Sequence, residues 1–97
     1  HITGGGFQEN VPRMLPEGKH AVINKDSYEV PAIFKMMARE GNVEEDMMYN
    51  TYNMGIGMMV CVDPADVDKA MEAMRSAGDT PYVIGKIVDG EKGVTLC

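Results

Sequence analysis

The clearest pattern of apolar and polar positions in the chain runs over residues 63–78. Apolar residues recur there every three or four positions, at Val67, Ala70, Met71, Met74 and Ala77, which is the spacing of an amphipathic helix. Asp63 is a good N-cap, Pro64 suits the first helical position, and Gly78 suits the position after the last turn. The pattern therefore predicts a helix over 63–78 with one apolar face.

Two apolar runs flank this helix and predict strands. Residues 56–62 are rich in Met, Ile and Val, which predicts a strand covered on both faces. Residues 82–88 predict a second strand, and the polar stretch 89–93 predicts a hairpin loop into a third strand over 94–97. The chain is therefore expected to end in a β-α-β-β unit.

The first half of the chain carries weaker patterns. Residues 20–24 predict a short strand, and residues 31–40 predict a helix that ends at Gly41. The positions of that helix expected to face inward are Ile33, Met36 and Met37.

Two further stretches predict short helices. Asn42 with Glu45 resembles an N-cap with its partner three residues on, which would open a helix through about residue 50. Residues 7–15 also have helical spacing, but Pro12 removes a backbone donor inside them. We therefore expect a kinked helix or two short turns over 7–15.

The ten methionines are interpreted as core filler, because Met fits irregular gaps. Those expected at core-facing positions are Met36, Met37, Met58, Met59, Met71 and Met74. Cys61 is interpreted in the same way, as a small buried residue within a strand. Together the patterns predict an α+β fold, a layered α/β sandwich, and no repeat or linker divides residues 1–97 into more than one unit.

Composition narrows the functional classes. The chain has 97 residues, 44% of them hydrophobic and 25% charged, as in an ordinary globular domain. Its net charge of −6 argues against nucleic-acid binding, which needs a basic surface. The longest apolar run, 58–62, is too short to cross a bilayer, and two cysteines make no disulfide framework, so no membrane partner and a cytoplasmic location are expected. We interpret the start at His1, inside a motif-like segment, as a sign of a longer protein.

The strongest local signal for chemistry is the run Thr3-Gly4-Gly5-Gly6 before a predicted helix start. Glycines let the backbone approach a ligand closely, and the N–H groups that follow favour a phosphate. Arg13, about two turns on, could reach a second anionic group. A tight turn explains a triple glycine equally well, and the residues alone leave both interpretations open.

A second candidate is the stretch 53–58, in which Gly55 and Gly57 alternate around a predicted strand start. Glycine there permits close backbone contact, and Asn53 could bind a ligand, but a bulge or a tight entry into a sheet is also consistent. No metal site is expected. The acidic run 44–46 suits the first turn of a helix, and His1, His20, Cys61 and Cys97 lack paired zinc spacing.

These residues resemble a known family, the aminoimidazole ribonucleotide synthetases, also called phosphoribosylformylglycinamidine cyclo-ligases. The matching blocks are residues 1–16, 41–43, 48–49, 53–58, 67–70 and 84–85. The resemblance covers essentially the whole chain and implies the later part of the family's C-terminal domain, without its N-terminal nucleotide-binding domain.

The family resemblance implies a homodimeric enzyme of purine biosynthesis. Such an enzyme uses ATP and Mg²⁺ to activate the amide oxygen of formylglycinamidine ribonucleotide as a phosphate ester. An internal nitrogen then displaces the phosphate and closes the imidazole ring of aminoimidazole ribonucleotide. These 97 residues alone are expected to be inactive, to bind neither ATP nor Mg²⁺, and to self-associate, because the missing part would leave apolar surface uncovered.

The resemblance also implies site residues. Those matching the glycine-rich signature, which lines the family's substrate groove, are His1, Thr3, Gly4, Gly5, Gly6, Asn10 and Arg13. Asn53, Gly55 and Gly57 match the second block, and His1 is the one candidate for a catalytic acid or base. The alternative hypothesis is a free-standing, non-catalytic α+β module whose glycine loop binds a small anion.

Overall fold

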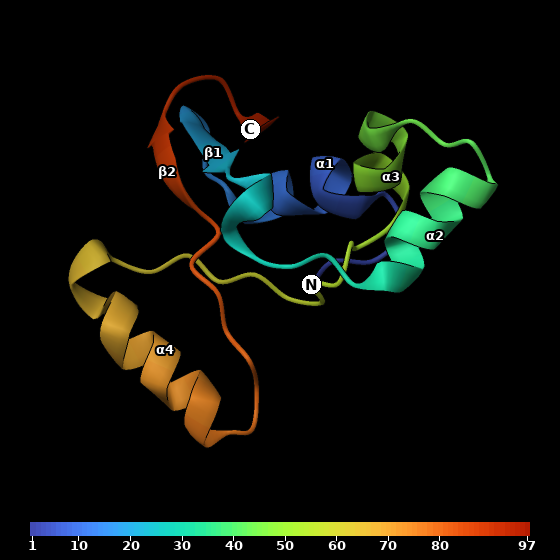
Figure 1. Ribbon diagram of the computed structural model, residues 1–97. Coiled ribbons are helices and arrows are strands. Elements are labelled where there is room, and N and C mark those ends of the chain that lie inside the picture. Colours follow the sequence, from blue (N-terminus) through green and yellow to red (C-terminus); the bar gives the residue numbers. More distant parts are fainter.

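The computed structural model describes all 97 residues and confirms the α+β class. One mixed sheet contains strands β1 (Lys19–Ile23), β2 (Gly85–Asp89) and β3 (Gly93–Leu96). The α-helices and 3-10 turns are α1 (Gly6–Asn10), η1 (Val11–Met14), η2 (Lys25–Ser27), α2 (Ala32–Glu40), α3 (Glu45–Thr51), η3 (Pro64–Asp66) and α4 (Val67–Ser76). Helices α1, α2 and α3 lie together to one side, whereas α4 extends away from them (Figure 1).

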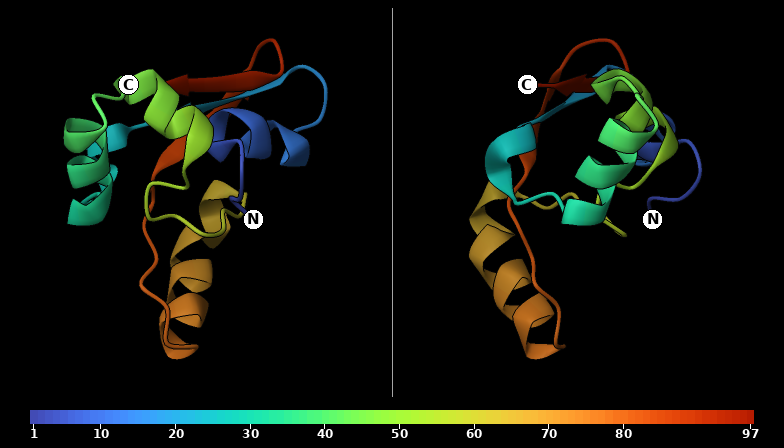
Figure 2. Two further views of the ribbon diagram at one scale, coloured as in Figure 1. Left: turned by 90° about the vertical axis from the view of Figure 1, so that its right-hand side faces the viewer. Right: turned by 45° about the vertical axis from the view of Figure 1, so that its right-hand side comes forward.

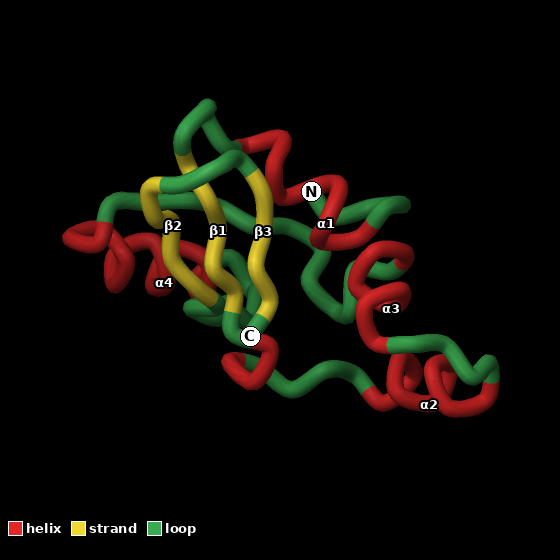
Figure 3. The backbone as a smooth tube through the Cα atoms, turned by 90° about the horizontal axis from the view of Figure 1, so that it is seen from above, coloured by secondary structure: helices red, strands yellow, loops and turns green.

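The sheet has the order β2-β1-β3, with β1 antiparallel to β2 and parallel to β3. The three strands lie side by side when the molecule is viewed from above (Figure 3). The strand predicted over 20–24 is therefore confirmed, and it is the central strand. The direct hairpin predicted through 89–93 is wrong, because β1 lies between β2 and β3 and is paired along both edges. The connection passes over the end of β1, where Gly90 N donates to Gly18 O at 2.9 Å.

The first strand of the expected β-α-β-β unit is also missing, because residues 56–62 belong to no sheet. They run without a neighbouring strand to complete the hydrogen bonds that a strand requires. The helix predicted after them is confirmed as η3 followed by α4. Gly78 comes just after its end, at a φ of +94° that favours glycine.

The kink predicted over 7–15 is confirmed. Helix α1 ends at Asn10, and the chain continues as the 3-10 turn η1, in which Pro12 occupies one of the first two positions. Phe7 and Val11 are almost fully buried on either side of this junction. The kink thus lets two short helical pieces present their apolar residues to one core.

Helices α2 and α3 form close to their predicted bounds but differ in detail. In α2 the half-buried residues are Phe34, Met37 and Ala38, whereas Ile33 and Met36 are exposed. The prediction of an inward Ile33 and Met36 is therefore wrong, because the helix turns its Phe34 side toward the core. Helix α3 begins after Glu44 rather than Asn42. Asn42 instead takes a left-handed φ of 50° in the connecting turn.

One hydrophobic core lies among α1, η1, α3 and β1. Its members are Ile2, Phe7, Val11, Leu15, Ala21, Ile23, Tyr28, Met48, Tyr49, Met54 and Ile56. No residue after Ile56 is buried. The expectation that Met58 faces the core is wrong, since it is 68% exposed, while Met59, Met71 and Met74 are half-buried. Two views at right angles and at 45° to Figure 1 show α4 projecting from the rest of the chain (Figure 2).

Candidate functional site

The three glycines of the first motif occupy three different environments. Gly5 and Gly6 adopt φ values of +98° and +60°, which favour glycine. A Cβ on Gly6 would lie 2.1 Å from Tyr49 O, so Gly6 lets α1 approach the end of α3 closely. A Cβ on Gly4 would meet no atom within 4 Å. Gly6 is therefore needed for the packing of α1 against α3, whereas the Cα of Gly4 faces open space outside the loop.

The Asn10 side chain holds the glycine loop in shape. Its Nδ2 donates to the carbonyl oxygens of Thr3, Gly4 and Gly6 at 3.1, 3.2 and 2.8 Å. Its Oδ1 accepts from the Arg13 guanidinium at 3.1 Å. Asn10 is 5% exposed, so these bonds are made largely out of water. The amide turns the loop carbonyls inward and links Arg13 to the loop.

The loop leaves backbone donors unused. The N–H groups of Thr3, Gly4 and Gly5 have no hydrogen-bond acceptor within the chain. Together with the Arg13 guanidinium they form a set of donors suited to an anion. One carboxylate opposes them, because a Cβ at Gly5 would lie 2.8 Å from the carboxyl carbon of Glu9. Sequence reasoning missed Glu9, and nothing in the spacing of the motif identifies it.

The structure brings the two predicted motifs together. Ile2 N donates to Gly57 O at 2.8 Å, which places the start of the glycine motif beside the end of the second motif. A Cβ on Gly6 would also lie 2.8 Å from Tyr52 O, directly before that second motif. Two segments about fifty residues apart in sequence therefore share one part of the surface.

Two residues of the second motif shape the local turn. Asn53 Oδ1 accepts from Gly55 N at 2.9 Å, and Met54 and Gly55 both adopt positive φ values. A Cβ on Gly55 would lie 2.5 Å from Pro31 Cδ, so Gly55 allows close packing against the start of α2. This geometry accounts for Asn53 and Gly55 without a ligand. A Cβ on Gly57, like one on Gly4, would meet no atom within 4 Å.

The remaining titratable candidates lie apart from this arrangement or lack partners in it. His1 is exposed at the amino terminus. His20 is half-buried on the central strand, with Nδ1 2.7 Å from Glu91 O and Nε2 2.6 Å from Thr95 Oγ1. Cys61 is exposed rather than buried, which corrects its interpretation as core. No three His, Cys, Asp or Glu side chains gather where they could hold a metal ion.

Displaced pKa values mark the core and the sheet edge. Burial raises the pKa of Tyr28, whose hydroxyl donates to Met54 O at 3.0 Å, and burial also raises the pKa of Tyr49. The hydrogen bond from Lys19 lowers the pKa of Asp89, at a distance of 2.5 Å. The hydrogen bond to Glu45 raises the pKa of Lys25. Each of these pKa shifts is explained by burial or by a hydrogen bond within the fold.

No helix of the chain is long and apolar enough to span a membrane.

The family model and the similar proteins found by comparison agree on one family. The family model described as "AIR synthase related protein, C-terminal domain" matches residues 1–97. Similar proteins called phosphoribosylformylglycinamidine cyclo-ligase occur in Agathobacter rectalis, 80% identical over 96 residues, and in Lachnospira eligens, 74% identical over 97 residues. A third, from Lachnoclostridium phytofermentans, is 62% identical over 97 residues. These matches cover 99–100% of this chain and 28% of each relative, so the chain spans little more than a quarter of their length.

Proposed function

The chain belongs to the family of AIR synthase related proteins, as their C-terminal domain, and we propose that it contributes to a cyclo-ligase of purine biosynthesis. The proposed reaction is the ATP-dependent closure of formylglycinamidine ribonucleotide to aminoimidazole ribonucleotide. The names of its relatives support this reaction, because a protein 80% identical to it is called phosphoribosylformylglycinamidine cyclo-ligase. Their greater length favours this proposal over a free-standing anion-binding module.

The role we propose for this chain is to hold the phosphate of the ribonucleotide substrate in the glycine loop. The observation that carries the proposal is the inward rotation of the loop carbonyls onto Asn10. That rotation leaves the N–H groups of Thr3, Gly4 and Gly5 available to phosphate oxygens. A phosphate bound there would face donors rather than carbonyl oxygens.

Arg13 and Glu9 would then tune the charge of the site. The Arg13 guanidinium is held by Asn10 Oδ1 and would neutralise part of the phosphate charge. The Glu9 carboxylate would repel the same anion. Because Glu9 is exposed, its side chain can turn into solvent as the phosphate binds. The proposal therefore expects the Glu9 side chain to move when the substrate binds.

This chain contains no group of three His, Cys, Asp or Glu side chains that could hold a metal ion by themselves. Magnesium in nucleotide enzymes usually rests on one or two carboxylates together with the phosphates. We propose that the intact enzyme binds ATP and Mg²⁺ through residues outside this chain, and that it is a homodimer in the cytoplasm.

Gly4→Val in the intact enzyme tests the proposed phosphate loop. A Cβ at Gly4 would meet no atom of the protein within 4 Å, so the melting temperature is expected to change little. It would block the close approach of a phosphate, and loss of charged hydrogen bonds should raise KM for the ribonucleotide about tenfold or more. Gly5→Val is a poorer test, because φ at Gly5 is +98° and the variant would strain the loop itself.

Arg13→Gln provides a second measurement, with Arg39→Gln as its matched control. Arg39 is exposed on α2, away from the loop. We expect Arg13→Gln to raise KM and Arg39→Gln to leave it unchanged. Normal kinetics for both Gly4→Val and Arg13→Gln would mean that the glycine motif is only a turn.

A further inference from the structure

The turn over residues 53–55 contains a residue in an unfavourable backbone conformation. Met54 adopts a left-handed φ of 53°, which a residue with a side chain keeps only where its surroundings hold it there. Two local hydrogen bonds, from Gly55 N to Asn53 Oδ1 and from Ile56 N to Asn53 O, involve the neighbours of Met54. Neither uses the carbonyl of Met54 itself. That buried carbonyl therefore needs a donor from elsewhere in the chain.

Tyr28, in the connection between β1 and α2, supplies this donor. Its hydroxyl donates to Met54 O at 3.0 Å, and both residues are buried, so loss of the hydroxyl would leave a buried carbonyl unpaired. Burial raises the pKa of Tyr28, which keeps the proton on the hydroxyl at neutral pH. Three residues further on, Pro31 packs against Gly55, where a Cβ would lie 2.5 Å from Pro31 Cδ. One connection thus holds two consecutive residues of the turn.

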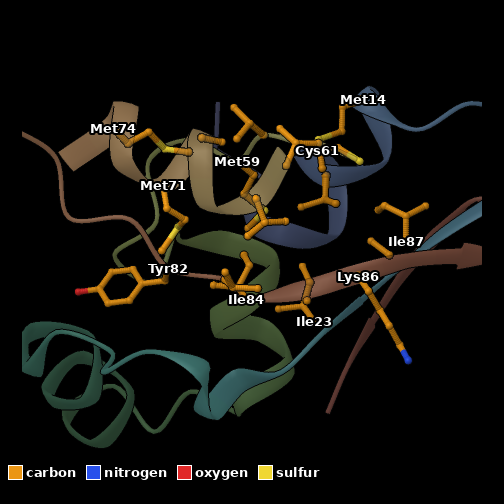
Figure 4. A pocket seen from close by; sticks show the side chains of 18 residues that line it. Met14, Ile23, Met59, Cys61, Met71, Met74, Tyr82, Ile84, Lys86 and Ile87 are labelled. Carbon is orange, nitrogen blue, oxygen red and sulfur yellow. The ribbon is translucent and has the colours of Figure 1, made fainter. Parts of the chain in front are cut away.

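The ring of Tyr28 is fixed in turn by Tyr82, from the segment that follows α4. The two ring centroids are 5.7 Å apart and the planes are tilted by 42°. Tyr82 also borders a hollow of about 160 Å³ that lies between α4 and the start of β2 and is lined mainly by hydrophobic side chains. Its hydroxyl points away from the other side chains around the hollow (Figure 4). Tyr82 therefore contacts Tyr28 through its ring, and its hydroxyl is not part of that contact.

The same turn determines where the glycine loop begins. Three residues after Met54, Gly57 O accepts from Ile2 N at 2.8 Å. Residues 3–5, whose N–H groups have no acceptor within the chain, follow Ile2 directly. The two ends of this link are short, because only two residues separate Met54 from Gly57 and none separates Ile2 from the donors. A displaced turn would therefore displace the donors of the loop.

We propose that Tyr28 is a positioning residue for the ribonucleotide site. Its hydroxyl holds the Met54 carbonyl, and the hydrogen bond between Ile2 and Gly57 carries that position to the donors of the glycine loop. Tyr28 belongs to neither motif and acts through the turn, without touching the substrate. This inference rests on the proposed function of the glycine loop. The competing explanation is a purely structural role, in which the hydroxyl stabilises the fold and leaves the geometry of the loop unchanged.

Tyr28→Phe in the intact enzyme tests the proposal, with Tyr82→Phe as its matched control. Each variant loses one hydroxyl and keeps the contact between the two rings. Kinetics are measured well below the melting temperature of each variant, and KM is determined separately for formylglycinamidine ribonucleotide and for ATP. Hydrogen exchange at the Ile2 amide in the same proteins reports on the link between the turn and the loop.

We expect Tyr28→Phe to raise KM for the ribonucleotide about fivefold or more, to leave KM for ATP unchanged and to speed exchange of the Ile2 amide. Tyr82→Phe should change none of the three. A purely structural hydroxyl would lower the active fraction, and with it kcat, without changing either KM. That result, a rise in both KM values, or an equal effect of Tyr82→Phe would overturn the proposal.

Gly4→Val and Arg13→Gln separate this inference from the proposed function on which it rests. If these two variants raise KM for the ribonucleotide and Tyr28→Phe does not, the loop binds phosphate and only the role of Tyr28 is wrong. If neither of them changes KM, the phosphate loop is wrong, and the role of Tyr28 is wrong with it.

Discussion

Two regions of this chain have similar apolar patterns and very different burial. The body, residues 1–56, contains every buried residue, whereas the arm, residues 57–84, contains none. Helix α4 in the arm has the clearest amphipathic pattern in the sequence, yet its apolar residues are at most half-buried. Short α1 in the body contains Phe7, which is 0% exposed. Burial thus depends on a second apolar surface facing the first, and amphipathicity alone does not supply one.

The body buries its apolar side chains because α1, η1, α3 and β1 all pack around one core. Phe7 packs edge-on against Tyr49, with ring centroids 5.3 Å apart, and joins α1 to α3. In the arm, α4 faces a hollow and an unpaired segment instead. Most of the folding free energy of the chain should therefore come from the body.

Large-to-small substitutions give the largest expected contrast between the two regions. Phe7→Ala should destabilise the chain by about 3–5 kcal/mol, because it leaves a cavity in a fully packed site. Met71→Ala on α4 removes a half-buried side chain beside an existing hollow and should cost well under half as much. Chemical denaturation measures both. Equal losses would show that the arm is packed as tightly as the body.

Two glycines with positive φ provide a matched pair for steric crowding. A Cβ at Gly6 would lie 2.1 Å from Tyr49 O, whereas at Gly78 it would meet nothing within 4 Å. Gly78→Ala should cost only the backbone strain, about 1 kcal/mol. Gly6→Ala should cost at least about 2 kcal/mol more, because backbone must also move. Thermal unfolding of the two variants tests this, and a similar loss for both would contradict the close approach of α1 to α3.

Tyr28 gives a smaller effect that depends on pH. Tyr28→Phe leaves Met54 O without its donor and should cost about 1 kcal/mol at pH 7. The Tyr82 hydroxyl in the arm makes no hydrogen bond within the chain. Tyr82→Phe is therefore the control at neutral pH, and its stability should stay unchanged.

The pH dependence follows from the raised pKa of Tyr28. Since its folded pKa lies above the unfolded value of about 10, the stabilisation is complete below pH 10 and is lost as the pH rises further. Above pH 10 the wild-type chain should therefore lose stability faster than Tyr28→Phe. Parallel alkaline profiles for the two proteins would exclude Tyr28 as a contributor.

Local signals predicted the parts of the fold that local interactions determine. Caps and spacing predicted α4 and α2, and Pro12 predicted the break between α1 and η1. Pairing could not be predicted in the same way. Residues 56–62 have the composition of a strand, but a strand needs a neighbour, and the chain places none there. The position of β1 between β2 and β3 likewise depends on the whole sheet rather than on the turn at 89–93.

In the candidate site too, the sequence predicted some features, whereas others depend on the whole fold. The sequence identified the glycine motif, and the structure places Ile2 of that segment beside Gly57. The sequence could not distinguish Gly6, which allows close packing, from Gly4, which faces open space. Nor could spacing show that Asn10 donates its amide hydrogens to the loop carbonyls. These roles depend on contacts in three dimensions, which the order of residues along the chain does not show.

Residue-resolved hydrogen exchange of the 97-residue chain tests the contrast between body and arm most directly. We predict that hydrogen-bonded amides of α1, α3 and β1 exchange only through global unfolding. Amides of residues 58–62 should exchange at nearly unfolded rates, with α4 opening far more often than the body. Uniform protection through α4 and residues 58–62, at the level of α1 and β1, would contradict this contrast.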